Sequence, residues 1–465
     1  MTILLTGATG YIGGRLLPLL ERSGARVRCL ARDPARLRAR VAPATEITRG
    51  DCLDEASLDA ALAGVDTAFY LVHSMTTRRD FADVDHRAAA TFGRAAANAG
   101  VRRIVYLGGL SDGGDTLSPH LRSRNETGES LRASGVPVVE FKASIVIGAG
   151  SLSFEMIRAL VERLPIMICP RWIRTQTQPI AVDDLLAYLI AALALPHGDS
   201  RTFEIGGPDV ISYGDLMREY ARQRGLRRWL VPVPLLTPRL SGLWLALVTP
   251  AQARVGRALV EGLRNATAVR SDAARQLPVT PRRLATAIAE AIADPSRPDL
   301  FLQTEWRDAD MPAAQLFARV ERIGGANGWY FGDLLWQSRG WIDRLLGGVG
   351  MQRGRACPDR CAVGDVIDCW RVEAYAPDRR LRLVAEMKVP GRAWLEFEVE
   401  PIDGGRRARI RQTATFDPRG LFGRLYWYAL FPVHVVMFRG MLDAIVNGRP
   451  LVRPQTRPAA QEKRS

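Results

Sequence analysis

The stretch "LTGATGYIGG", Leu5 to Gly14, places Gly7, Gly10 and Gly13 directly after an apolar run. A backbone that turns sharply and approaches a pyrophosphate needs residues without side chains, and the N-terminus of the next helix meets the phosphate charge. A glycine array alone is a weak signal, but this one follows an expected strand and opens an expected helix. It predicts a dinucleotide-binding unit, against the alternative of a tight turn that binds no ligand.

Short apolar runs alternate with longer helical segments from residue 1 to about residue 195. The expected strands are residues 2–7, 26–32, 44–51, 67–72, 102–108 and 137–144. Most of the helices between them end at a glycine, which suits a helix C-terminus. Strands and helices in alternation imply parallel strands with right-handed crossovers. The predicted fold class is therefore α/β, with a doubly wound Rossmann sheet.

The second expected strand ends in Arg32, where a protein that prefers NAD(H) usually has a carboxylate. An Arg there can pair with the ribose phosphate of NADP(H), so the sequence favours NADP(H) over NAD(H). Asp33 can instead cap the next helix, and a solvated Arg32 without a ligand is the alternative. Asp51, in "RGDCLD", is placed to receive the adenine amino group. The segment "LVHSM", which contains His73, should run beside the ribose and the nicotinamide.

The chain continues past the expected sheet into a second region of different character. Another strand and an amphipathic helix follow, and "DPSRPDL", residues 294–300, is the best linker candidate. Beyond it, four segments of alternating character predict an antiparallel meander, followed by an aromatic-rich helix. The predicted strands are residues 365–377, 379–391, 392–404 and 406–418. The expected domains are residues 1–230 (nucleotide-binding), 231–295 (helical extension), 301–450 (α+β) and 451–465 (disordered tail).

The charge of the chain does not point to nucleic acid. The net charge is +15, but Lys occurs only at three positions and the Arg residues are scattered through every segment. No clustered basic helix or recognition motif accompanies them. A length of 465 residues exceeds one ordinary core, so we expect at least two domains.

The six cysteines are spread along the chain, and no secretory leader precedes the first strand, so we expect reduced thiols and a cytoplasmic protein. Cys357, Cys361 and Cys369 do not have zinc spacing, so we expect no metal. Two apolar stretches, residues 240–248 and 425–438, are too short to span a bilayer. Buried helices are the first interpretation of both, and a peripheral contact with the inner face of the membrane stays open.

The motifs "TGATGYIGG", "LARD", "RGDCLD", "VPVVEFKASIVIGAGS" and "EIGGPD" make the first 230 or so residues resemble an atypical short-chain dehydrogenase/reductase. More closely, the order of "SPHLRSR", "RWIRTQTQPIAVDD" and "LTPRLSGLWLALVTP" resembles a bacterial group of NAD(P)-binding oxidoreductases related to the complex I nucleotide-binding accessory subunit. The segments "MKVPGRAWLEFEV" and "FDPRGLFGRLYWYALFPVHVVMF" look like a domain of unknown function similar to the START and polyketide-cyclase helix-grip folds.

This resemblance implies a cofactor site on the matching positions. The expected cofactor-binding residues are Gly7, Thr9, Gly10, Tyr11, Ile12, Gly13, Arg32, Asp51, Cys52, Leu71, Val72, His73, Gly108 and Arg124.

The catalytic set of the family, a Ser and a Tyr-x-x-x-Lys pair, is missing. Gly108 and Gly109 stand in the Ser region with Ser111 nearby, and "HLRSR" puts His120 and Arg124 in the Tyr and Lys positions. Arg124 can keep the positive charge and the ribose donors, but it cannot exchange a proton. His120 can act as an acid only when it is protonated, which the adjacent Arg opposes, and otherwise it positions a group or is structural. The catalytic candidates are His120, Arg124 and Ser111.

Two functions remain. The first is a nicotinamide-dependent oxidoreductase that acts on an apolar carbonyl, quinone or lipid-like compound, held in the C-terminal domain. The second is a nucleotide-binding accessory or redox-sensing protein that engages a protein complex or lipid, because the fold alone does not decide the chemistry.

Overall fold

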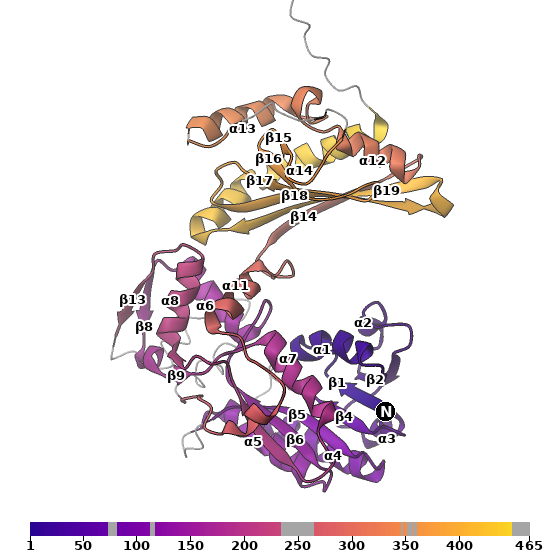
Figure 1. The fold of residues 1–465 in the computed structure, drawn as a ribbon, viewed down its shortest axis with the longest axis vertical. Helices are drawn as coiled ribbons and strands as arrows, with labels where there is room; N and C mark the ends of the chain where they lie inside the picture. Colours follow the sequence, from indigo (N-terminus) through magenta and orange to yellow (C-terminus); the bar gives the residue numbers. More distant parts are fainter. Residues whose placement is uncertain are drawn as a thin grey trace, which may run out of the picture. The chain divides into compact units, whose positions relative to one another are not determined.

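The computed structural model describes residues 1–72, 81–111, 117–233, 265–345, 347–350, 357 and 360–448. The chain divides into two compact units, Met1–Pro298 and Asp299–Ser465 (Figure 1). The expected apolar helix at residues 240–248 and the expected tail at 451–465 lie outside the described residues.

A seven-stranded parallel sheet forms the centre of the first unit, in the order β11-β6-β5-β4-β1-β2-β3. Its strands are β1 (Thr2–Thr6), β2 (Arg26–Ala31), β3 (Glu46–Arg49), β4 (Thr67–Tyr70), β5 (Arg103–Gly109), β6 (Val138–Ala143) and β11 (Arg201–Ile205). β4 is buried along its whole length, as expected for a strand covered on both faces. The doubly wound α/β fold is confirmed.

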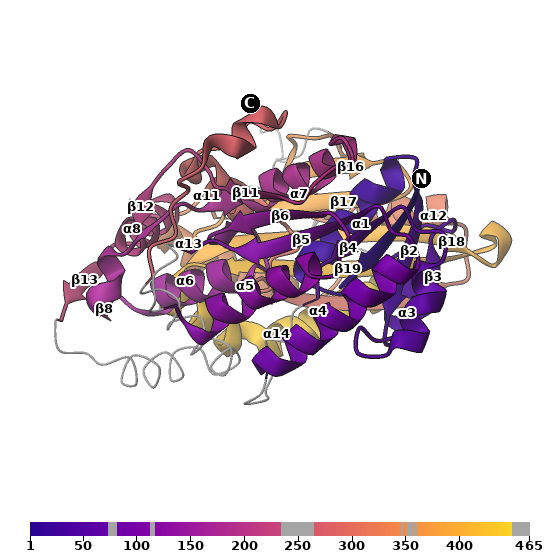
Figure 2. The ribbon, with the colours of Figure 1, turned by 90° about the horizontal axis from the view of Figure 1, so that it is seen from below.

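Helices cover both faces of this sheet (Figure 2). α1 (Tyr11–Arg22) and α7 (Val182–Ala191) lie on one face, and α3 (Glu55–Leu62), α4 (Phe81–Asn98) and α5 (Pro119–Arg132) lie on the other. The helical spacing of apolar residues decides which side of each helix packs: Leu16, Leu17 and Leu20 of α1 are all buried. The glycine turn therefore lies at the carboxyl edge of the sheet, the edge at which doubly wound folds bind ligands.

A smaller apolar core completes the first unit. It joins α6 (Leu152–Arg163), α8 (Tyr213–Gln223) and α11 (Leu284–Ala293). The other short elements are α2 (Ala35–Arg38), β7 (Val146–Ile147), β8 (Ile166–Cys169), β9 (Gln176–Thr177), β10 (Ile180–Ala181), β12 (Ile211–Ser212) and β13 (Trp229–Pro232).

A six-stranded antiparallel sheet forms the second unit, in the order β14-β19-β18-β17-β16-β15. Its strands are β14 (Phe301–Ala309), β15 (Val366–Ile367), β16 (Trp370–Ala376), β17 (Arg380–Ala385), β18 (Gly391–Ile402) and β19 (Arg407–Pro418). α12 (Ala313–Glu321), α13 (Asp333–Leu345) and α14 (Gly420–Asn447) lie on one face, called here the inner face (Figure 1). The separate α+β unit is confirmed.

The structure corrects the expected strands of this unit at two places. β14 was not expected, because Gln303, Glu305 and Arg307 put polar groups on its packed side and hide the period of two. The single strand expected at residues 365–377 is broken into β15 and β16. Asp368 has φ 56° there and accepts a hydrogen bond from Trp329 Nε1 at 2.7 Å.

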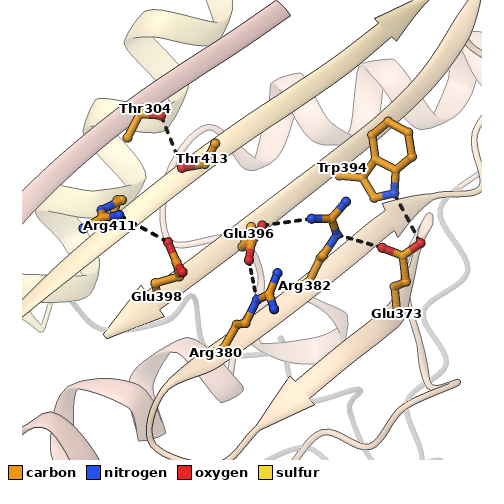
Figure 3. Close-up of polar contacts among 9 residues, drawn as sticks. All are labelled: Thr304, Glu373, Arg380, Arg382, Trp394, Glu396, Glu398, Arg411 and Thr413. Atoms are coloured by element: carbon orange, nitrogen blue, oxygen red, sulfur yellow. Dashed lines mark hydrogen bonds and ion pairs between the residues drawn. The ribbon is translucent and has the colours of Figure 1, made fainter. Parts of the chain in front are cut away.

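The outer face of the six-stranded sheet carries paired charges (Figure 3). Arg382 of β17 contacts Glu373 at 2.7 Å and Glu396 of β18 at 3.2 Å. Glu396 also pairs with Arg380, and Arg411 of β19 lies 3.6 Å from Glu398. One face is thus mostly apolar and covered by helices, while the other carries paired charges and faces solvent.

α14 departs from the expectation of a buried helix. Trp427, Met437 and Phe438 are buried, but Phe422, Leu425 and Tyr428 are 71%, 58% and 63% exposed. In the described part of the chain, α14 is the one helix whose length and apolar composition would allow it to cross a membrane. Length and composition alone do not separate such a helix from a core helix, and α14 packs one side against β14 and β19.

Candidate functional site

The glycine turn joins β1 to α1 with almost no free space. Gly7 has φ 69°, and the Gly10 N–H donates a 2.8 Å hydrogen bond to the Gly7 carbonyl. A Cβ at Gly7 would lie 2.5 Å from the Leu71 carbonyl oxygen, and one at Gly13 would lie 2.3 Å from the Gly7 carbonyl oxygen. The turn therefore needs glycine at both positions. The first N–H groups of α1 have no partner within the helix, so the turn fits the pyrophosphate of a nicotinamide dinucleotide.

Thr6 fixes the neighbouring strand ends. Its hydroxyl donates to the Phe69 carbonyl at 3.0 Å and accepts from the Leu71 N–H at 3.0 Å. Leu71 and Val72, both half-buried, are thereby held where β4 ends beside the glycine turn. His73, which we expected next in this row, lies outside the described residues.

The expected ribose side is lined by charged and polar groups. Arg32 follows β2 and is exposed, while Asp33 accepts from the Ala35 N–H at 3.1 Å and so acts on the start of α2. Asp51 uses Oδ1 to accept from the Leu53 N–H at 3.0 Å. The Cys52 side chain is buried in the apolar core beneath α3 and α4, and burial raises the pKa of its thiol to about 12.

Arg40 is a residue that the sequence pattern did not single out. Its Nη2 lies 2.7 Å from the position that a Cβ on Gly14 would take, in the first turns of α1. A second guanidinium therefore stands beside the end of the helix that faces the phosphates. The sequence analysis missed Arg40 because it lies far along the chain from the glycine motif.

The Ser region of the family has little room for a side chain. A Cβ at Gly108 would lie 2.7 Å from Oε1 of Glu140, and one at Gly109 would lie 3.0 Å from Leu121. Glu140 is 1% exposed and is held by Arg132 at 2.6 Å. Ser111 is half-buried and lies beyond the end of β5. The packing around Glu140 is therefore a structural reason for the glycine at position 108, where the family has a Ser.

α5 presents the two candidate residues from one face, as their spacing predicts. The Ser118 hydroxyl accepts from the Leu121 N–H at 3.3 Å and starts the helix, which puts His120 in the first turn, half-buried. Arg124 donates from Nη2 to the Leu107 carbonyl at 2.6 Å. Its guanidinium lies 5.7 Å from the ring centre of Tyr106. Arg124 is thus anchored at the carboxyl end of β5.

Lys142, which was not expected, and Tyr11, one of the expected cofactor-binding residues, also lie near the carboxyl edge. Lys142 of β6 pairs in register with Gly108 and is half-buried, which places a rare lysine of this chain beside the Ser region. The Tyr11 hydroxyl is buried and has no hydrogen-bond partner among the residues that the structure describes. Burial raises its pKa to about 12, so the hydroxyl stays protonated. The alternation of side chains along β6 could have indicated that Lys142 belongs to the site. No signal in the neighbouring sequence, however, indicated that the Tyr11 hydroxyl would be buried.

Two family descriptions match the chain. A family described as NAD(P)H-binding matches residues 7–137, and a protein of unknown function (DUF2867) matches residues 300–441. Each match falls inside one of the two units.

Curated relatives with reductase names match the first unit. A (4-alkanoyl-5-oxo-2,5-dihydrofuran-3-yl)methyl phosphate reductase of Streptomyces griseus is 33% identical over 234 residues, which cover 48% of this chain and 74% of the relative. A ceramide reductase of Caulobacter vibrioides is 25% identical over 267 residues, covering 55% of this chain and 82% of the relative.

Among solved structures, the triphenylmethane reductase of Citrobacter in complex with NADP(H) has the same fold as the first unit. Its TM-score is 0.52 at 17% identity, over 63% of this chain and all of that chain.

Proposed function

The chain belongs, through its first unit, to the atypical short-chain dehydrogenase/reductase family, and on that premise we propose that it is an NADP(H)-dependent oxidoreductase of an apolar carbonyl, quinone or lipid-like compound. The observation that carries the proposal is Arg124, anchored on Leu107 at the same carboxyl edge as the glycine turn. A nicotinamide ring bound at that edge would supply a hydride.

Exposed guanidinium groups support the preference for NADP(H). Arg32 follows β2 and Arg40 lies beside Gly14, so both can pair with a ribose phosphate. Replacing Arg32 with Ala should raise the dissociation constant of NADPH about tenfold or more and change that of NADH little, because a charge-assisted bond contributes about 1.5–3 kcal/mol. Arg36→Ala, an exposed substitution on α2, is the control.

The side chains at the carboxyl edge of the sheet can supply some of the functions that a reduction needs, but not all of them. Arg124 can hold a ribose or polarise a substrate oxygen through its guanidinium donors, but it cannot deliver a proton. The proton must then come from His120 or from water. The Ser that shares this work in the family is absent, because glycine stands at both positions of the Ser region and a Cβ at Gly108 would press on the buried Glu140.

The missing Ser and Tyr of the family's catalytic set favour a second candidate function. With Gly in place of Ser at position 108 and no Tyr at position 120, the chain can hold the nucleotide as an accessory or redox-sensing protein without reducing anything.

One experiment separates the two candidates. Purified protein is mixed with NADPH and a panel of quinones and aldehydes, and the loss of NADPH absorbance is followed for the wild type, His120→Ala and Arg124→Met. The reductase predicts turnover that both variants reduce at least tenfold. His197→Ala and Arg122→Met, at exposed positions, should leave the rate unchanged. Tight NADPH binding without turnover on any compound would favour the accessory function.

The order of helices and strands in the second unit supports the finer parts of the proposal. Two helices, a meander and a long final helix follow β14, the order expected for a START-like unit that encloses an apolar molecule. The exposed apolar side of α14 suits a cytoplasmic protein that lies against a membrane surface. Sedimentation with vesicles containing phosphatidylglycerol tests this contact: Leu425→Glu should weaken it, and Gln315→Glu on α12 should not.

A further inference from the structure

Two buried glutamines lie on the inner face of the six-stranded sheet. Gln303 of β14 and Gln412 of β19 are 7% and 1% exposed. Gln303 pairs in register with Ala414, and Gln412 pairs with Glu305, so the two side chains are diagonal neighbours with Cβ atoms roughly 7 Å apart. Both side chains point to the face that α14 covers. These two residues are called the glutamine pair below.

No side-chain polar atom of the glutamine pair has a hydrogen-bond partner in the part of the chain that the structure describes. Oε1 and Nε2 of both residues are buried and unpaired. A buried polar atom without a partner costs about 1–3 kcal/mol, so four of them are a large burden for one unit. Leucine at both positions would avoid the free-energy cost of the unpaired amides. The presence of glutamine instead is explained if the amides bind a partner.

α14 passes over the glutamine pair between two fixed points. Near its start, the Trp427 ring stacks on Phe301 at 5.5 Å and on Phe416 at 5.7 Å. Further on, Arg439 pairs with Glu305 at 2.9 Å. The part of α14 between these points therefore lies above the stretch of β14 and β19 that carries the glutamine pair.

That part of α14 adds a third unpaired polar atom. The ring of His434 stacks on Phe438 at 5.4 Å and meets Trp427 edge-on at 5.6 Å. Its Nδ1 is buried and finds no partner among the described residues. Burial lowers the pKa of His434, with Arg339 acting in the same direction, so the imidazole is neutral at physiological pH. The unpaired polar groups, which are the two amides and the imidazole, are thus neutral and include both donors and acceptors.

We propose that the second unit binds a neutral, largely apolar molecule between α14 and the inner face of the sheet, and that the glutamine pair and His434 bind a carbonyl or hydroxyl group on it. The aromatic rings of Phe301, Phe416 and Phe438 supply the apolar wall. The inference deepens the proposed function, because a carbonyl and a hydroxyl are the two sides of the reduction. Binding to the second unit, however, does not require that hydride transfer occurs.

The charges nearby argue for a neutral ligand over a carboxylate. Glu305 and Arg307, on the same side of β14, are paired with Arg439 and Asp443 of α14 at 2.9 and 2.7 Å. Neither of these guanidinium groups is free to neutralise an ionised head group, and Arg339, which also acts on His434, donates to the Lys388 carbonyl at 3.2 Å. Burying an unpaired charge costs far more than burying a carbonyl. A fatty acid anion should therefore bind no better than an alkane of the same length.

Displacement of a neutral fluorescent probe tests the site on the full-length protein without nucleotide. Nile red is bound first and then displaced by 2-dodecanone, by 1-dodecanol, by dodecane or by dodecanoate. The ketone and the alcohol should displace it about tenfold better than dodecane, because one or two hydrogen bonds contribute about 0.5–1.5 kcal/mol each. Dodecanoate should gain no such advantage.

Substitutions test whether the glutamine pair causes the preference for the ketone over the alkane. Gln303→Leu with Gln412→Leu should abolish the advantage of the ketone over the alkane while the melting temperature stays at or above that of the wild type. Thr304→Val with Thr413→Val is the matched control, because these hydroxyls lie 3.3 Å apart on the outer face of the same strands (Figure 3) and should leave the preference intact. Gln412→Met, with nearly the same volume, serves if the double variant does not fold.

The outcomes are distinct. A wild type that does not prefer the ketone, as expected if water alone satisfies the glutamine pair, would overturn the proposal, and so would a Leu variant that keeps the preference. Both results are independent of NADPH oxidation, so failure of the reductase function would not be mistaken for failure of this site.

Discussion

Gly13→Ala should weaken nucleotide binding while leaving the fold in place. The new Cβ would lie 2.3 Å from the Gly7 carbonyl oxygen and 2.7 Å from its carbon, both of them backbone atoms that no side-chain rotation can move. The glycine turn must therefore shift away from α1, and with it the N–H groups that would face the pyrophosphate.

The size of the effect follows from the overlap. Forcing an extra carbon into a packed site costs about 1–3 kcal/mol. If the turn shifts to relieve this overlap, the cost is transferred to binding, and the dissociation constant of NADPH rises about fivefold to about a hundredfold. Titration calorimetry with NADPH measures the constant, and thermal melting reports how much of the cost remains in the fold.

A graded series of alanines controls the measurement. A Cβ at Gly10 would lie 3.1 Å from the Gly7 oxygen, and one at Gly198 would have no atom within 4 Å. The loss of affinity should therefore increase from Gly198→Ala, which should bind like the wild type, through Gly10→Ala to Gly13→Ala. Wild-type affinity in Gly13→Ala, or equal losses in all three variants, would refute the reasoning.

Three further perturbations follow from the site. Arg124→Lys should bind NADPH better than Arg124→Met in calorimetry, because the amine keeps a charge at the strand end, and equal affinities would show that the charge does not act on the cofactor. Gly108→Ser should lower the stability by about 1–3 kcal/mol in urea unfolding, because its Cβ meets the buried Glu140, and an unchanged midpoint would mean that Glu140 moves freely. Tyr11→Phe should reduce the loss of stability between pH 10 and 12. Burial raises the pKa of Tyr11 to about 12, so the folded protein keeps a proton that the unfolded chain releases from about pH 10 upward, and stability falls as the pH rises through that interval. Urea unfolding of the variant and the wild type at pH 9 and pH 11 should diverge, and parallel behaviour would contradict this.

The parallel sheet was predictable because its signals are local. Each buried strand is an apolar run closed by a turn residue, and Gly7, Gly10 and Gly13 stand at fixed offsets from the first of them. β14 was not predictable in the same way. Its packed side carries Gln303, Glu305 and Arg307. The partners of Glu305 and Arg307 lie more than a hundred residues away on α14, and the Gln303 side chain has none among the described residues.

The candidate site shows the same limit. The spacing of His120 and Arg124 predicts a shared helix face, but not that Arg124 reaches the Leu107 carbonyl. The sequence shows two glycines in the Ser region, but it does not show why glycine stands there. The collision with Glu140 depends on the register between β5 and β6, which only the folded sheet fixes.

The charge pairs on the outer face of the second unit have a consequence for how its strands choose their neighbours. On that face β17 offers Arg380 and Arg382, β18 offers Glu396 and Glu398, and β19 offers Arg411 (Figure 3). A slip of two residues would still set opposite charges side by side, so these pairs do little to fix the register. If β17 were placed directly beside β19, however, arginine would face arginine, which is destabilising. The charges therefore identify β18 as the strand that must come between the other two, and they favour one strand order among the meanders that the apolar pattern alone would allow.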